Sequence, residues 1–239
     1  MKVVKVKFNP NKIVSNPEKS FDIFSQKILK SAQRGQKVDL SGFSNELYQL
    51  GDSFEAINKK ELMNKRSKQL AENLVRQNLD SMAGAIYSFL IKFNKGNFSL
   101  VEEFATSALA IAKRLNDPMH VMARCNDLRE IYKILPPKDD KFMKVLYEEK
   151  RALGKIVNDY DGVKKRYNTV NREMKPRDNY RILLADVKFE IGKRRIGKDD
   201  KLALQELSEA KATYEELGLS NKTACVEEFM NSLDWMLRK

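Results

Sequence analysis

Apolar side chains between residues 79 and 158 recur every three or four positions, and short runs of Gly, Asn, Asp or Pro interrupt them. This spacing places the apolar side chains on one face of an α-helix. The interruptions are Gly96-Asn97, Asn116-Asp117-Pro118 and Pro136-Pro137. Each is long enough for a turn and too short for a long crossover, so we predict consecutive helices that fold back on one another as hairpins.

The helices predicted in this stretch span about 81–93, 99–115 and 118–134, and a fourth begins after Asp139-Asp140. The composition agrees with an all-α fold, because 10 Gly and 6 Pro among 239 residues provide few turns for the short strands of a sandwich or barrel. A hydrophobic content of 42% is sufficient for a core.

Three regions are expected along the chain. Residues 1–16 alternate apolar and basic side chains around Asn9-Pro10, which indicates an extended or disordered basic arm. Residues 17–78 form N-terminal helices, the first of which begins at Pro17, with one or two helices after it. Residues 79–239 form a helical-hairpin array that ends in a capping helix, for about nine helices in all.

Several local motifs resemble those of the tetratricopeptide repeat (TPR) family. Gly96-Asn97-Phe98 is similar to the turn between the two helices of that repeat, and Ala108-Leu109 stands where its second helix carries a small residue and Leu. Leu128 and Tyr132 suit the next first helix, whereas Arg129 stands where the family prefers Gly. The resemblance implies a right-handed α-α solenoid of TPR-like hairpins, with a concave face that serves as an adaptor or scaffold for a partner.

The residues that most often perform chemistry are read as structural. His120, the sole histidine, is expected on the surface, and Cys125 and Cys225 are expected to be buried as small hydrophobes. Adjacent carboxylates such as Glu148-Glu149 point about 100° apart on a helix, so we expect solvated faces rather than an acid and a base. No phosphate-binding glycine loop is present. We predict a protein that is not an enzyme and uses no cofactor or metal.

No stretch approaches the roughly 20 apolar residues of a membrane-spanning helix, and no secretory signal begins the sequence. We therefore expect a cytoplasmic protein that does not bind a membrane. Its net charge of +12 is unevenly spread: residues 138–198 carry 18 basic and 10 acidic side chains, whereas residues 199–239 carry 5 basic and 9 acidic ones. The chain has a basic middle and an acidic end.

Within the basic middle, cations alternate with tyrosines, and we predict a partner-binding surface there. Its candidate residues are Lys164, Lys165, Arg166, Tyr167, Arg172, Lys193, Arg194 and Arg195. Three interpretations stay open. The cations form an ordinary solvated face, they bind a peptide or protein surface that is acidic, or the cluster in residues 160–198 binds RNA or DNA by neutralising phosphates. We expect a non-catalytic protein-protein interaction module, with nucleic-acid binding as the alternative; the oligomeric state is left open.

Overall fold

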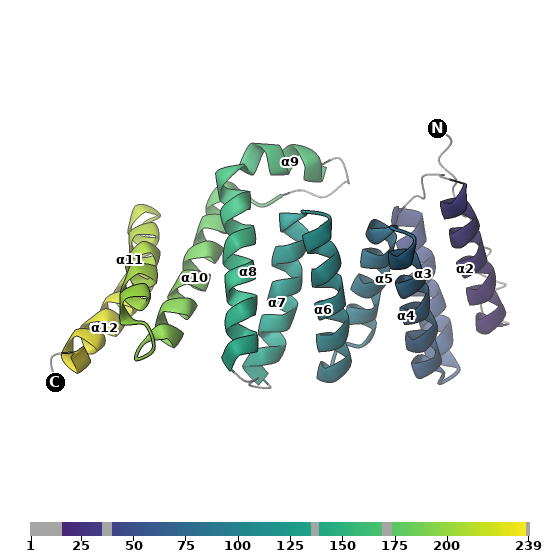
Figure 1. Ribbon diagram of the computed structural model, residues 1–239, viewed down its shortest axis with the longest axis horizontal. Coiled ribbons are helices and arrows are strands. Elements are labelled where there is room, and N and C mark those ends of the chain that lie inside the picture. Colours follow the sequence, from purple (N-terminus) through teal and green to yellow (C-terminus); the bar gives the residue numbers. More distant parts are fainter. Residues whose placement is uncertain (1–15, 35–39, 135–138, 169–173, 238–239) are drawn as a thin grey trace. The chain divides into compact units, whose positions relative to one another are not determined.

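The computed structural model describes residues 16–34, 40–134, 139–168 and 174–237 (Figure 1). Every regular element in these ranges is an α-helix, which confirms the all-α prediction. Of the predicted basic arm, residues 1–15 lie outside the described residues. None of the described helices is both long and apolar enough to cross a membrane.

The chain forms two compact units, residues 1–116 and 117–239. Unit 1 contains α2 (Pro17–Gln33), α3 (Leu40–Ala56), α4 (Lys60–Arg76), α5 (Asp80–Phe93) and α6 (Phe98–Arg114). Unit 2 contains α7 (Pro118–Ile134), α8 (Asp139–Asn158), α9 (Tyr160–Asn168), α10 (Arg177–Arg195), α11 (Asp200–Glu216) and α12 (Ser220–Leu237). The described ranges thus hold eleven helices rather than the nine expected.

The expected division after residue 78 falls inside unit 1, between α4 and α5, which pack against each other. The turn there does not differ from the turns within each unit. Asn78 adopts a positive φ of 58°, and the Leu79 N–H donates to the Leu74 carbonyl at 2.9 Å. Asn58 and Gly218 end their helices with the same Schellman bonding, which satisfies carbonyls left open at a helix C-terminus.

Aromatic side chains fill the core of unit 1. Phe24 stacks on Phe43 with ring centroids 5.2 Å apart, and both are at most 1% exposed. Beside this core, the buried amides of Asn64 on α4 and Asn94 at the end of α5 donate to each other at 2.8 Å in both directions. This reciprocal pair satisfies two buried polar groups and fixes how α4 and α5 align.

The helices of unit 2 pack in chain order, α7 on α8, α8 on α10, α10 on α11 and α11 on α12. Contact between successive helices is the packing of an α-solenoid. The short helix α9 is the exception, since it packs on α8 and lies across the C-terminal end of that helix (Figure 1).

One of the two cysteine predictions is wrong. Cys125 is fully buried, as expected, whereas Cys225 is exposed on α12. The reason is that α12 packs against α11 with one face only, through Val226, Phe229 and Met230. Cys225 precedes Val226 and therefore points about 100° away from that face.

Candidate binding surface

The structure places seven of the eight predicted partner-binding residues in two groups. Lys164, Lys165, Arg166 and Tyr167 lie on α9, and Lys193, Arg194 and Arg195 form the last turn of α10. Arg172 lies outside the described residues. The two groups sit at opposite ends of α8, because α8 and α10 run antiparallel and α9 follows the C-terminus of α8 (Figure 1).

The end of α10 packs on the first half of α8. The Arg194 guanidinium lies 4.1 Å from the centroid of the Phe142 ring, and Arg195 Nε donates to the Tyr147 hydroxyl at 3.0 Å. Tyr147 lies 11 positions before Asn158, the last residue of α8, or about 17 Å of helix at 1.5 Å per residue, and α9 begins beyond that end. The seven described residues therefore do not form a single surface.

The three cations at the end of α10 are held by their neighbours. Glu190 accepts from Lys193 Nζ at 2.6 Å and from Arg194 Nε at 2.7 Å. Burial raises the pKa of Glu190, but the hydrogen bonds and positive charges of Lys193 and Arg194 together outweigh burial, so the pKa is lowered overall. The ion pairs of this turn lie within α10, whereas the contacts of Arg194 with Phe142 and of Arg195 with Tyr147 join α10 to α8. Together these contacts leave little of the turn for a partner.

The cations on α9 are in a different environment. Lys164 and Lys165 are exposed, and neither takes part in an ion pair with another described residue. Arg166 pairs with Asp159 at 3.3 Å and is still 67% exposed. The chain beyond α9 adds exposed Lys175 and Arg177 next to this helix. We call Lys164, Lys165, Lys175 and Arg177, together with Tyr160, the α9 patch.

Tyr160 holds the α9 patch together. Its hydroxyl donates to the Lys175 carbonyl at 2.7 Å, and Lys164 Nζ lies 5.7 Å from the centroid of its ring. Arg177 Nε donates to the Val157 carbonyl at 3.1 Å, which satisfies one of the open carbonyls at the end of α8. The patch is thus a preformed surface of cations around a fixed aromatic ring.

Two further tyrosines were predicted to alternate with these cations. Tyr180 packs against Tyr160 with ring centroids 6.3 Å apart and is 3% exposed, so no ligand can reach its face. Burial raises the pKa of Tyr180, and a hydrogen bond with the Lys175 backbone partly offsets this rise. Tyr167 is half-buried. The aromatic surface open to a ligand is smaller than the sequence indicates.

Glu149 contradicts the prediction that adjacent carboxylates are solvated. Its side chain is 2% exposed, and Arg129 Nη1 on α7 lies 3.4 Å from Glu149 Oε2. Burial raises the pKa of Glu149 to about 7, although the positive charges of Arg129 and Lys133 act in the opposite direction. Glu206 is also buried and accepts from Lys150 Nζ, which joins α8 to α11. Glu149 is buried because of how α7 and α8 pack, and the residues next to it in the sequence do not reveal this packing.

His120 lies on the surface, as predicted, at the start of α7. Asp117 accepts hydrogen bonds from the backbone N–H groups of Met119 and His120 at 3.1 Å and lies 2.7 Å from His120 Nδ1. Burial raises the pKa of Asp117, but the hydrogen bonds with His120 and the backbone outweigh burial and lower it. Asp117 and His120 thus cap a helix. Among the described side chains, no group of three or more His, Cys, Asp or Glu is arranged to hold a metal ion.

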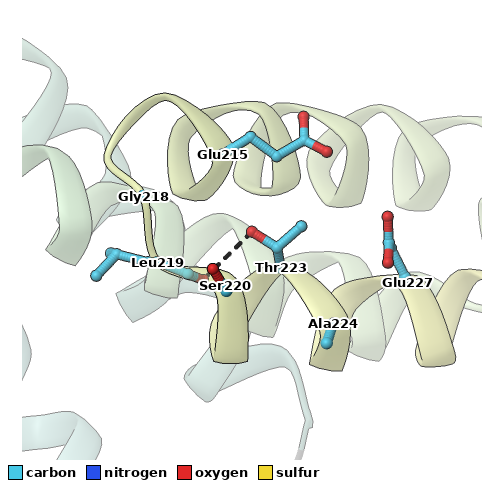
Figure 2. Close-up of a pocket in the computed structure, with 7 residues that line it drawn as sticks. All are labelled: Glu215, Gly218, Leu219, Ser220, Thr223, Ala224 and Glu227. Atoms are coloured by element: carbon cyan, nitrogen blue, oxygen red, sulfur yellow. Dashed lines mark hydrogen bonds between the residues drawn. The ribbon is translucent and has the colours of Figure 1, made fainter.

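Two shallow depressions lie elsewhere on the surface. One, of about 520 Å³ in unit 1, is lined by residues of α2 and α4 and is crossed by ion pairs of Glu18 with Lys59 at 2.6 Å and Arg66 at 3.3 Å. The other, of about 400 Å³, lies between α11 and α12 in unit 2 (Figure 2). Neither coincides with the α9 patch.

No model of a known protein family matches the chain, and no curated protein matches its sequence. Among solved structures, the crystal structure of BtubC (BKLC) from P. vanneervenii is similar over 97% of this chain and 93% of that chain. The two sequences are 15% identical, and the TM-score is 0.43. A likeness of this size is too weak to carry an argument about function.

Proposed function

We propose that the protein is a non-catalytic, TPR-like interaction module that binds an acidic peptide or protein surface through the α9 patch. The observation that carries the proposal is the pair of exposed lysines on α9, Lys164 and Lys165, which have no counter-ion among the described residues and lie beside an anchored ring. Cations without partners on a preformed surface attract an acidic partner and direct its approach.

The position of α9 supports the same proposal. It contributes Val163, which is 3% exposed, to the core, but its other side chains from 161 to 167 are exposed or half-buried. A short helix that interrupts the repeat and buries little apolar surface adds little to the stability of the array. Insertions on one face of a repeat array often serve binding.

The hairpins of both units support the TPR-like part of the proposal. Three small residues of these helices, Ala108, Ala203 and Ala210, are each at most 4% exposed. Small residues at such crossings let two helix axes approach closely. Arrays of this type present extended surfaces for binding, which agrees with a role as an adaptor.

The nucleic-acid alternative has weaker support. Affinity for RNA or DNA grows with the number of phosphates contacted, and the separation of the α10 cations from α9 lowers that number. Bases also need open aromatic faces for stacking, and Tyr180 is buried. An acidic protein needs only a few well-placed cations, which is what the α9 patch offers.

Fluorescence anisotropy distinguishes these partners. The labelled probes are a Glu/Asp-rich peptide, a Lys-rich peptide of equal length and single-stranded RNA, each titrated at low and physiological salt. We expect the acidic peptide to bind, and the Lys164→Glu/Lys165→Glu variant to weaken this binding at least about tenfold, since each lysine becomes a like charge. The matched control is Lys144→Glu/Lys201→Glu, which makes the same charge change at two exposed lysines elsewhere in unit 2.

The outcomes separate the alternatives. RNA binding that persists at physiological salt and is lost in the Lys164→Glu/Lys165→Glu variant would replace the proposal with nucleic-acid recognition. If the control variant weakens peptide binding equally, the loss is due to net charge and not to the α9 patch. Absence of binding by every probe would leave the α9 patch as a solvated face and overturn the proposal.

A further inference from the structure

We infer that the acidic surface bound by the α9 patch is the α11–α12 hairpin of a second copy of this chain. The inference rests on the proposed function, because it names the partner of the same patch. It follows from an acidic, partly hollow surface on unit 2 whose charge complements that of the α9 patch.

The α11–α12 groove is the depression of about 400 Å³ between these two helices. Figure 2 shows Glu215 on α11 and Glu227 on α12 at its two sides, with Gly218 and Leu219 in the turn that closes one end. Thr223 and Ala224 of α12 also line the groove. Such a groove accommodates the aliphatic part of a lysine while its ammonium group reaches a carboxylate.

The carboxylates of this hairpin outnumber their basic partners. Glu215 and Glu227 are 52% and 48% exposed, and they share Lys211, whose Nζ lies 3.5 Å and 2.8 Å from them. The hydrogen bond with Glu227 raises the pKa of Lys211. Exposed Glu228 adds another negative charge to the surface. The α11–α12 hairpin thus has an excess of negative charge, whereas the α9 patch has an excess of positive charge.

The hairpin is held in place before any partner binds. Tyr214 Oη on α11 donates to Asp186 Oδ1 on α10 at 2.6 Å, and Lys222 Nζ on α12 pairs with the same carboxylate. These contacts join three helices at a point where Tyr214 is 1% exposed. A rigid surface loses less conformational entropy on binding than a mobile one.

A single copy leaves both surfaces open. The α9 patch is attached to α8, whereas α12 packs on α11, and α10 lies between α8 and α11 in the packing order of the unit. The basic α9 patch of one copy can therefore face the acidic α11–α12 groove of another copy, where their opposite charges attract. A contact that joins different surfaces of two identical chains is heterologous and continues from copy to copy unless the geometry closes a ring. We expect weak association that salt screens.

Sedimentation velocity tests the inference across a range of protein concentrations. The wild type is expected to gain mass with concentration at about 20 mM salt and to be monomeric at about 0.5 M salt. Two variants, Lys164→Glu/Lys165→Glu and Glu215→Lys/Glu227→Lys, are each expected to stay monomeric at low salt. An equimolar mixture of the two is expected to associate again at low salt, because the intact acidic surface of one variant meets the intact basic surface of the other, and the two reversed surfaces also carry opposite charges.

The Lys144→Glu/Lys201→Glu variant is the control for net charge, and circular dichroism verifies that each variant is folded. Monomeric wild-type protein at low salt, or assembly that neither variant reduces, would overturn the inference. To separate that result from failure of the proposed function, the acidic peptide is titrated against the Glu215→Lys/Glu227→Lys variant. Peptide binding by this variant, together with a wild type that does not self-associate, keeps the proposed function and rejects the second copy as partner, whereas no peptide binding rejects both.

Discussion

At the scale of single residues, Glu149 carries a charge that the fold disfavours. The side chain is 2% exposed between α7 and α8, and its Oε2 has Arg129 as a neighbour at 3.4 Å. Glu130 opposes ionisation, and Arg129 and Lys133 favour it, but burial has the largest effect. The pKa rises from its ordinary value of 4.5 to about 7 in the folded protein. A raised carboxyl pKa means that the folded state retains a proton that the unfolded state loses.

The resulting pH dependence has a definite sign. Below about pH 4.5 the group is protonated in both states and contributes no difference. Between about pH 4.5 and 7 the unfolded state ionises first, so stability falls as the pH rises, by at most roughly 3 kcal/mol at 1.36 kcal/mol per pKa unit. Glu149→Gln removes this dependence. We therefore expect the variant to gain about 2–3 kcal/mol relative to the wild type between about pH 5 and pH 8.

Urea unfolding of both proteins across this pH range measures the difference, in which the titration of all other groups largely cancels. Gln resembles the protonated carboxyl of Glu149, so any difference between the two in packing beside Arg129 is the same at every pH and does not alter the slope. Glu148→Gln, one position away at 22% exposure, is the control. A difference between Glu149→Gln and the wild type that stays constant with pH would contradict the assignment.

At the scale of helices, the crossing of α10 and α11 depends on Gly192. A Cβ added there would lie 2.7 Å from Leu207 Cγ and 3.2 Å from the Ala203 carbonyl oxygen, so the helices would have to separate. Overpacking of this kind costs about 1–3 kcal/mol, which exceeds the roughly 1 kcal/mol that Ala gains over Gly within a helix. We expect Gly192→Ala to destabilise the protein by about 1–2 kcal/mol.

Gly154 on α8 provides the matched control, because a Cβ there would meet nothing within 4 Å. With no clash, the helix propensity of Ala dominates, and Gly154→Ala should stabilise the protein by about 0.5–1 kcal/mol. Thermal or urea unfolding of the two variants compares the same chemical change in two environments. Equal effects at both positions would show that the close approach at Gly192 does not limit the crossing.

Helix positions were predictable because their signals are local. Pro17 and Pro118 begin helices where the sequence indicates, and the residues of positive φ, such as Asn116 and Gly96, end them. The contacts that define the binding surface, by contrast, join residues that are far apart in the sequence. Nothing next to Arg194 in the sequence shows that it stacks on Phe142, and nothing next to Glu149 shows that Arg129 covers it. The basic cluster was therefore predicted as one surface, whereas packing divides it.

At the scale of the whole molecule, each of the two units has a buried core of its own. Phe24, Phe54 and Phe89 lie in unit 1, and Leu153, Leu207 and Tyr214 lie in unit 2, all at most 1% exposed. With the boundary between residues 116 and 117, the Tyr48–Phe89 ring contact and the Asn64–Asn94 hydrogen bonds both lie within unit 1. A compact unit with its own core can in principle fold by itself.

We therefore expect fragments 1–116 and 117–239 each to show helical circular dichroism and a cooperative thermal transition. The control is a cut after residue 78, where the sequence also has a helix turn. This cut removes α5 from α3 and α4, separates Phe89 from Tyr48 at a ring distance of 5.2 Å, and breaks the Asn64–Asn94 pair. Fragment 1–78 should then melt without cooperativity, because it exposes the aromatic core and loses the apolar contacts and the Asn64–Asn94 pair that join α5 to α3 and α4. Cooperative folding of fragment 1–78 together with loss of folding in 1–116 or 117–239 would place the boundary at residue 78 instead.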